Sequence, residues 1–259
     1  MKRSILRDLL ILLGAFGLIW LVFSLFSYPE DPQLLSIESE EKMGEAYMDL
    51  ILLNPLFKEL ENEQVDSAVT VIGNRLEESL NHSEYNYRFV VFKSEMINAF
   101  TVPGGNILIS SGLIGFCESP EELAAVMAHE MGHVEERHVV SRLVKELGIE
   151  ILTSGDLYVI GNVTGLLTST SFDRKQEEEA DLFAAELLEK SAIEPRTLAT
   201  LFRRLEDESD NELMKHFEII STHPNFRSRI REALSYVPGD DFAPIAIGLD
   251  WEDTQAQLK

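Results

Sequence analysis

The chain has 259 residues, which is enough for one sizeable domain. Its 45 acidic and 22 basic residues give a net charge of −23, which repels phosphate backbones and argues against nucleic acid as a partner. The single cysteine, Cys117, allows no disulfide bond within the chain, and we interpret it as a small packing residue.

The first element in chain order is an apolar segment at residues 9–26, which follows the basic residues Lys2, Arg3 and Arg7. Such a stretch is typical of a transmembrane helix or of the apolar part of a signal peptide. No small-residue cleavage pattern and no lipobox cysteine follow it, which favours a retained anchor. Because acidic residues follow the span, we expect residues 1–8 in the cytoplasm. If the source is a Gram-negative bacterium, the protein would then cross the inner membrane once, and the domain after the span would face the periplasm.

The remainder of the chain is predicted to be mainly α with a small β-sheet, an α+β domain. Strands are expected at residues 86–92 and 106–110, and a Pro-Gly-Gly turn signal precedes the second strand. Besides the helices discussed below, the pattern predicts helices over residues 39–53, 65–80, 226–236 and from Pro195 towards Met214. Residues 238–259 are expected to form an acidic C-terminal tail, to which we assign no role.

The most informative segment contains the pattern H-E-x-x-H, formed by His129, Glu130 and His133. The sequence S-P-E-E from Ser119 is a capping box, so a helix is expected to begin at Pro120. Residues four apart lie one turn apart on the same helix face, so the two histidines can bind one metal ion. Glu130 is displaced around the helix and can reach a water on that metal. The helix is otherwise so apolar that we expect it to be buried.

A catalytic zinc site usually has three protein ligands and one open position. His138 does not fit the longer pattern H-E-x-x-H-x-x-G-x-x-H, and we interpret it as structural. Glu177 and Asp181 are four residues apart beside an apolar stripe, so Glu177 is our preferred third ligand. Asp181 would then accept the second N–H of a ligand histidine. Glu178 is a competing ligand, whereas Glu179 is interpreted as part of an acidic first helical turn.

Four ordered blocks carry a family resemblance. They are N-A-F-T-V-P-G-G from Asn98, H-E-M-G-H-V-E-E-R-H from His129, R-K-Q-E-E-E-A-D from Arg174, and S-T-H-P-N-F-R-S-R-I from Ser221. The chain resembles the HtpX/BepA-like zinc metallopeptidases, relatives of the CAAX prenyl endopeptidases and the mitochondrial Oma-type proteases. The resemblance implies a gluzincin-type peptidase domain over residues 38–237, behind the N-terminal transmembrane helix, with one zinc ion.

The resemblance also implies roles for particular residues. It assigns the third zinc ligand to Glu177, although Asp173 stands where the family often carries serine. It places His223 near the metal, where it either stabilises the tetrahedral intermediate or occupies the open coordination position of a resting enzyme. Arg229 supports the same region. The segment at the edge of the cleft, which includes the strand at 106–110, would pair with the substrate backbone by β-augmentation. Its substrate-binding residues are Asn98, Ala99, Phe100, Gly104, Gly105 and Asn106.

The resulting hypothesis is a zinc-dependent endopeptidase that cleaves misfolded or unassembled envelope proteins, with Glu130 as the general base. One alternative is a chaperone-like or assembly factor that keeps the fold but cleaves little. A second alternative is a zinc hydrolase that acts on a small molecule.

Overall fold

The computed structural model describes residues 35–147, 165, 171–209, 219 and 222–258. The expected cytoplasmic N-terminus at 1–8 and the expected anchor at 9–26 lie outside these residues. Among the residues that are described, no helix is both long enough and apolar enough to cross a membrane. The prediction of a mainly helical domain with a small sheet is confirmed.

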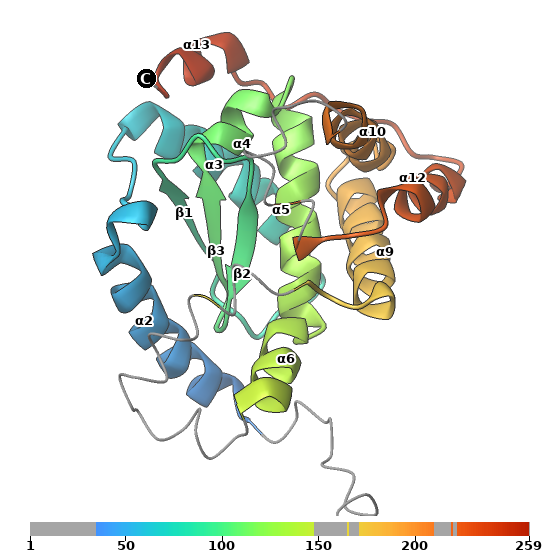
Figure 1. The fold of residues 1–259 in the computed structure, drawn as a ribbon. Helices are drawn as coiled ribbons and strands as arrows, with labels where there is room; N and C mark the ends of the chain where they lie inside the picture. Colours follow the sequence, from blue (N-terminus) through green and yellow to red (C-terminus); the bar gives the residue numbers. More distant parts are fainter. Residues whose placement is uncertain (1–34, 148–164, 166–170, 210–218, 220–221, 259) are drawn as a thin grey trace, which may run out of the picture. The chain divides into compact units, whose positions relative to one another are not determined.

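A three-stranded sheet lies at the centre of the described domain (Figure 1). β1 (Arg88–Phe92) pairs in parallel with β3 (Asn106–Ser110), and β2 (Ala99–Val102) pairs antiparallel with the other side of β3. Leu108 of β3 lies opposite both Val90 of β1 and Phe100 of β2. The expected pairing of residues 106–110 with a substrate is therefore wrong, because a strand with neighbours on both sides has no free edge to offer.

Side chains alternate between the two faces of this sheet, and each face contributes to a separate apolar cluster. The face with Val91, Ile107 and Ile109 packs with α3 (Glu63–Glu77) and α5 (Pro120–Glu135). The opposite face includes Phe92, Phe100 and Leu108. It packs with α2 (Ile37–Leu53), the 3-10 turn η2 (Pro55–Phe57) and α6 (His138–Leu147).

The two helices that carry the sequence motifs begin at strong capping signals. α5 starts at Pro120, where the Ser119 hydroxyl accepts a hydrogen bond from the Glu122 N–H at 3.3 Å. α9 (Arg174–Lys190) starts after Asp173, whose carboxylate accepts from Lys175 N and Gln176 N in a capping box. An aspartate therefore caps this helix where the family resemblance suggested a serine. α5 lies between the sheet and α9 (Figure 1).

The remaining helices surround this arrangement. α4 (Ser111–Phe116) follows β3 directly, and α10 (Thr197–Ser209) and α12 (Phe226–Ser235) pack beside α5 and α9. α13 (Trp251–Ala256) lies within the segment that we expected to be an acidic tail. Its Trp251 indole is buried and donates to the Cys117 carbonyl at 2.8 Å. This part of the C-terminal segment is thus packed against the domain.

Candidate metal centre

A close contact between α5 and α9 sets the positions of the motif residues. A Cβ atom added to Gly132 would lie 3.0 Å from the Ala180 Cα atom, so the two backbones pack directly against each other. His129 and His133 stand three residues before and one residue after Gly132. Glu177 and Asp181 have the same offsets from Ala180. Because these offsets keep all four residues near the contact faces, the two helices bring Glu177 close to both imidazoles and Asp181 close to that of His129.

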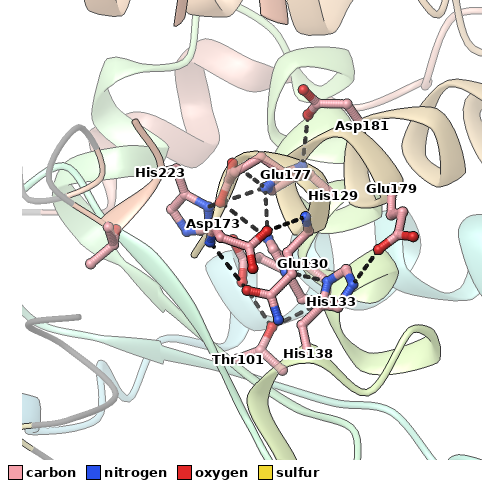
Figure 2. A network of polar contacts seen from close by, with 12 residues as sticks. Thr101, His129, Glu130, His133, His138, Asp173, Glu177, Glu179, Asp181 and His223 are labelled. Atoms are coloured by element: carbon pink, nitrogen blue, oxygen red, sulfur yellow. Dashed lines mark hydrogen bonds and ion pairs between the residues drawn. The ribbon is translucent and has the colours of Figure 1, made fainter. Parts of the chain in front are cut away.

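His129, His133, Glu177 and His223 form one buried cluster (Figure 2). Each offers a possible ligand atom, and these atoms all lie within 4.8 Å of one another. His129 Nε2 is 3.1 Å from His133 Nε2, 3.2 Å from His223 Nδ1 and 3.7 Å from Glu177 Oε2. Two ligand atoms that are about 2.1 Å from a tetrahedral zinc ion lie about 3.4 Å apart. The spacing therefore suits a single metal ion.

The charge of the surrounding groups also suits a cation. The buried groups at this site include the carboxylates of Glu130, Glu177 and Asp181 and the guanidinium of Arg229. Burial lowers the pKa of His133 well below its usual value, which keeps that imidazole neutral as a metal ligand must be. Burial opposes ionisation of Glu177, but His223 and Arg229 outweigh it and hold the pKa of that carboxyl below its usual range. Excess buried negative charge is costly without a partner, so the donor set fits a divalent cation.

The structure separates the two glutamates that competed for the third ligand position. Glu177 is 1% exposed and lies in the cluster. Glu178 is 41% exposed and pairs with Arg174, its Oε1 atom 2.6 Å from the Arg174 Nε atom. A ligand to a buried ion in this cluster can therefore come from position 177 but not from position 178.

Asp181 and Arg229 both lie beside His129. Asp181 Oδ1 is 2.9 Å from His129 Nδ1, the ring nitrogen that points away from the cluster. Arg229 donates to both oxygens of Asp181 at 2.7 Å, and its Nη1 atom lies 2.5 Å from Glu177 Oε2. Burial opposes ionisation of Asp181, but Arg229 outweighs it and lowers the pKa of this carboxyl. The Arg229 guanidinium thus holds the carboxylates of Glu177 and Asp181 in place, because its planar array of N–H donors fixes the geometry of a bound carboxylate.

Glu130 is held by a residue that the sequence did not single out. The Thr101 hydroxyl of β2 donates to Glu130 Oε2 at 2.8 Å. Among the described residues, Glu130 Oε1 accepts no hydrogen bond, and it lies 3.5 Å from His223 Nε2. The carboxylate therefore has one anchored oxygen and one oxygen that faces the cluster.

His223 stands at the fourth corner of the cluster. Its Nδ1 atom is 3.0 Å from Glu177 Oε1, and Arg229 Nη1 donates to its carbonyl oxygen at 3.3 Å. Burial disfavours a charged ring, but the carboxylates of Glu177 and Glu130 outweigh it and raise the pKa of His223. This position is compatible with both roles that the family resemblance implied.

His138 and Glu179, which we interpreted as a structural residue and as part of an acidic helical turn, also lie next to the site. His138 Nδ1 lies 2.9 Å from His133 Nδ1, and His138 Nε2 lies 3.2 Å from Glu179 Oε2. Both contacts join residues from different helices, so the sequence pattern carried no signal for them.

The six expected substrate-binding residues fall into two groups. Ala99 and Phe100 lie in β2, directly after Asn98, on the strand that contacts α5. Gly104, Gly105 and Asn106 lie in a buried turn beside α2 and the segment before β1, where a Cβ atom on Gly104 would meet the Glu41 Cα atom at 2.7 Å. Asn106 uses its amide group to donate to the Pro103 carbonyl at 2.8 Å. These residues thus make close contacts within the domain, and their contact with a substrate stays a prediction.

The buried cluster is a candidate metal centre, and comparison with known families gives the class of protein as a metallopeptidase. The chain belongs to peptidase family M48, whose model matches residues 60–237.

The individual relatives match this chain over only part of their own length. The chain is 29% identical to the beta-barrel assembly-enhancing protease of Yersinia pestis over 217 residues, which cover 77% of this chain and 44% of that protein. It is 28% identical to the mitochondrial metalloendopeptidase OMA1 of Schizosaccharomyces pombe, over 60% of this chain and 48% of that protein. It is 32% identical to the metalloprotease LoiP of Escherichia coli, over 56% of this chain and 60% of that protein. The chain therefore spans about half the length of these relatives.

Proposed function

We propose that this protein is a zinc-dependent endopeptidase. The observation that carries the proposal is the buried cluster in which His129, His133 and Glu177 converge, with the Glu130 carboxylate beside them. Two imidazoles and one carboxylate are the ligand set of a catalytic zinc site with an open position. Membership of a peptidase family supports hydrolysis of peptide bonds as the reaction.

His129, His133 and Glu177 would hold the zinc ion. When bound, zinc supplies a Lewis acid for the scissile carbonyl and lowers the pKa of water. Glu130 acts as the general base through Oε1, the oxygen that Thr101 leaves free. It takes the proton of the attacking water and passes that proton to the leaving amine. His223 would either donate a hydrogen bond to the oxyanion that forms from the scissile carbonyl or serve as a further zinc ligand in the resting enzyme.

We infer that an extended peptide binds along β2. Among the described strands, β2 pairs only with β3, so its other side is the side on which a peptide backbone could pair. Thr101 in the same strand contacts the proposed base, so a peptide here would pass the metal centre. Asn98, Ala99 and Phe100 would edge this cleft, and main-chain pairing would give affinity without a strict sequence requirement.

The proposed substrates are misfolded or unassembled envelope proteins. This proposal combines the predicted anchor at residues 9–26 with the name of a relative, the beta-barrel assembly-enhancing protease. That name also favours a second candidate function, assistance of assembly by the same domain without cleavage. The proposed location is the inner membrane, with the domain facing the periplasm.

The metal assignment is tested by zinc analysis of the purified full-length chain. We expect about one zinc ion per chain, together with digestion of casein that a chelator abolishes and added zinc restores. Glu177→Ala should lose the zinc, whereas Glu178→Ala, the neighbouring position on the same helix, should retain it. Full zinc content in Glu177→Ala would contradict the ligand assignment.

A further inference from the structure

We propose that His138 and Glu179 are positioning residues for the ligand His133. The proposal rests on the zinc site proposed above and adds two residues to it. The two ligand imidazoles are supported differently (Figure 2). On the side away from the cluster, His129 Nδ1 meets the buried carboxylate of Asp181 directly, whereas His133 Nδ1 is linked to the carboxylate of Glu179 through the ring of His138.

The direction of the hydrogen bonds between His133, His138 and Glu179 follows from which ring nitrogen of His133 binds the metal. His133 Nε2 faces the cluster, 3.1 Å from His129 Nε2 and 3.7 Å from Glu177 Oε1. A neutral imidazole that binds metal through Nε2 carries its proton on Nδ1. His133 Nδ1 must then donate to His138 Nδ1, 2.9 Å away. His138 in turn carries its proton on Nε2 and donates it to Glu179 Oε2 at 3.2 Å.

The local backbone explains why His138 can reach back to His133. Two residues that are five apart in one continuous helix point in different directions. Arg137 has a φ of 53°, in the left-handed region, and it separates the end of α5 from α6. This break turns the His138 ring towards His133. Non-glycine residues rarely adopt this conformation, so the surrounding structure must stabilise it.

Among the residues that the structure describes, His138 Nδ1 is the acceptor within hydrogen-bonding distance of His133 Nδ1. The His133 ring is fully buried and stacks on Phe172, with ring centroids 3.8 Å apart. Stacking restrains the plane of the ring, but a buried N–H group without an acceptor is costly. Glu179 is 37% exposed, and Lys175 Nζ lies 2.7 Å from its other oxygen. The proposed series of hydrogen bonds thus links the metal ligand His133 to the carboxylate of Glu179 at the protein surface.

The test compares substitutions that remove or keep the acceptor at position 138. Zinc affinity of the full-length protein is measured by competition with a chelator. His138→Leu should weaken zinc binding about 10- to 100-fold, as loss of a partner behind a metal ligand usually does. His138→Asn places an oxygen near the former Nδ1 position and should restore most of the affinity. Nitrogen-15 NMR should show the His133 proton on Nδ1 in the wild type and in His138→Asn.

A second comparison tests whether Glu179 acts through His138. Glu179→Ala should weaken zinc binding about tenfold in the wild type, and it should have little effect in the His138→Asn background. Glu178→Gln is the matched control, because it removes a charge from the same helical turn and should leave zinc affinity unchanged. Glu179 is partly exposed, so this variant remains informative even if His138→Leu does not fold.

The outcomes separate this inference from the zinc site itself. A wild-type chain that binds no zinc would count against the proposed function. Wild-type zinc binding that His138→Leu or Glu179→Ala leaves unchanged would overturn the positioning role. Equal losses in folded His138→Leu and His138→Asn, without a change in the NMR signal, would also overturn it, because they would indicate packing alone.

Discussion

A single hydroxyl from β2 sets the orientation of Glu130. The Thr101 hydroxyl lies 2.8 Å from Glu130 Oε2 and 3.1 Å from the Glu130 carbonyl oxygen, and its one proton is shared between these two acceptors. The side chain is thereby tied to the sheet, and Oε1 is the oxygen directed at the cluster. A base acts efficiently only when it is held within hydrogen-bonding reach of the proton it removes.

We expect Thr101→Val to slow cleavage while zinc content stays unchanged. Valine has a similar shape but cannot donate, and a hydrogen bond to a charged group contributes about 1.5–3 kcal/mol. A loss of about tenfold or more in kcat should follow, because each 1.4 kcal/mol corresponds to about tenfold in rate. Thr101→Ser keeps the hydroxyl and should retain most of the activity. Wild-type kcat in the valine variant would show that this bond does not orient the base.

Local spacing in the sequence indicated some of the site residues, the family resemblance indicated His223 and Arg229, and the contacts of Thr101 and Glu179 were not foreseen. His129 and His133 are recognisable because helical periodicity places them together, and Glu177 because it borders an apolar stripe. Thr101 lies 29 residues from Glu130, and Glu179 lies 41 residues from His138. No pattern within one helix or strand encodes such contacts.

Among the contacts between helices and strands, the contact between α5 and α9 is the one on which the site depends most. Gly132 allows the two helix backbones to touch, since its absent side chain would lie 3.0 Å from both Cα and carbonyl oxygen of Ala180. The ligands on both helices flank this contact, so its spacing fixes the distances between their ligand atoms.

We therefore expect Gly132→Ala to weaken zinc binding. Alanine normally stabilises a helix interior by about 0.5–1 kcal/mol relative to glycine, but here its methyl group would push α9 away by a few tenths of an ångström. Chelator competition should show lower zinc affinity. Gly115→Ala is the control, because its methyl group would meet only the Leu258 side chain at 3.6 Å. Equal zinc affinity in both variants would contradict this account of the helix contact.

Prediction of the elements succeeded where capping or periodicity was strong and failed elsewhere. Ser119 and Pro120 mark the start of α5 in the sequence, and the structure confirms it. β2 has only four residues, too few for a clear alternating pattern, so the central position of β3 was not foreseen. α13 is short, and its contacts come from residues distant in sequence, such as the Cys117 carbonyl that accepts from Trp251.

At the scale of the whole molecule, the apolar segment at 9–26 predicts a membrane anchor. The full-length protein should sediment with membranes and resist extraction by salt and alkali. Protease added to spheroplasts should digest the domain if it faces the periplasm. A mature N-terminus near Tyr28 would instead indicate a cleaved signal peptide, and extraction by salt alone would argue against a spanning helix.

In the proposed mechanism, the Glu130 carboxylate performs the proton transfers while His129, His133 and Glu177 hold the metal. Glu130→Gln separates these two roles, because glutamine keeps the size of the side chain but cannot accept the proton. Loss of a general base costs about 10²–10⁴ in rate, and more when the same residue also protonates the leaving group. The variant should fold, bind about one zinc ion per chain, still capture extended peptide, and cleave casein at least about a hundredfold more slowly. Near-normal cleavage by the zinc-loaded variant would contradict the mechanism, and loss of zinc would contradict the ligand assignment.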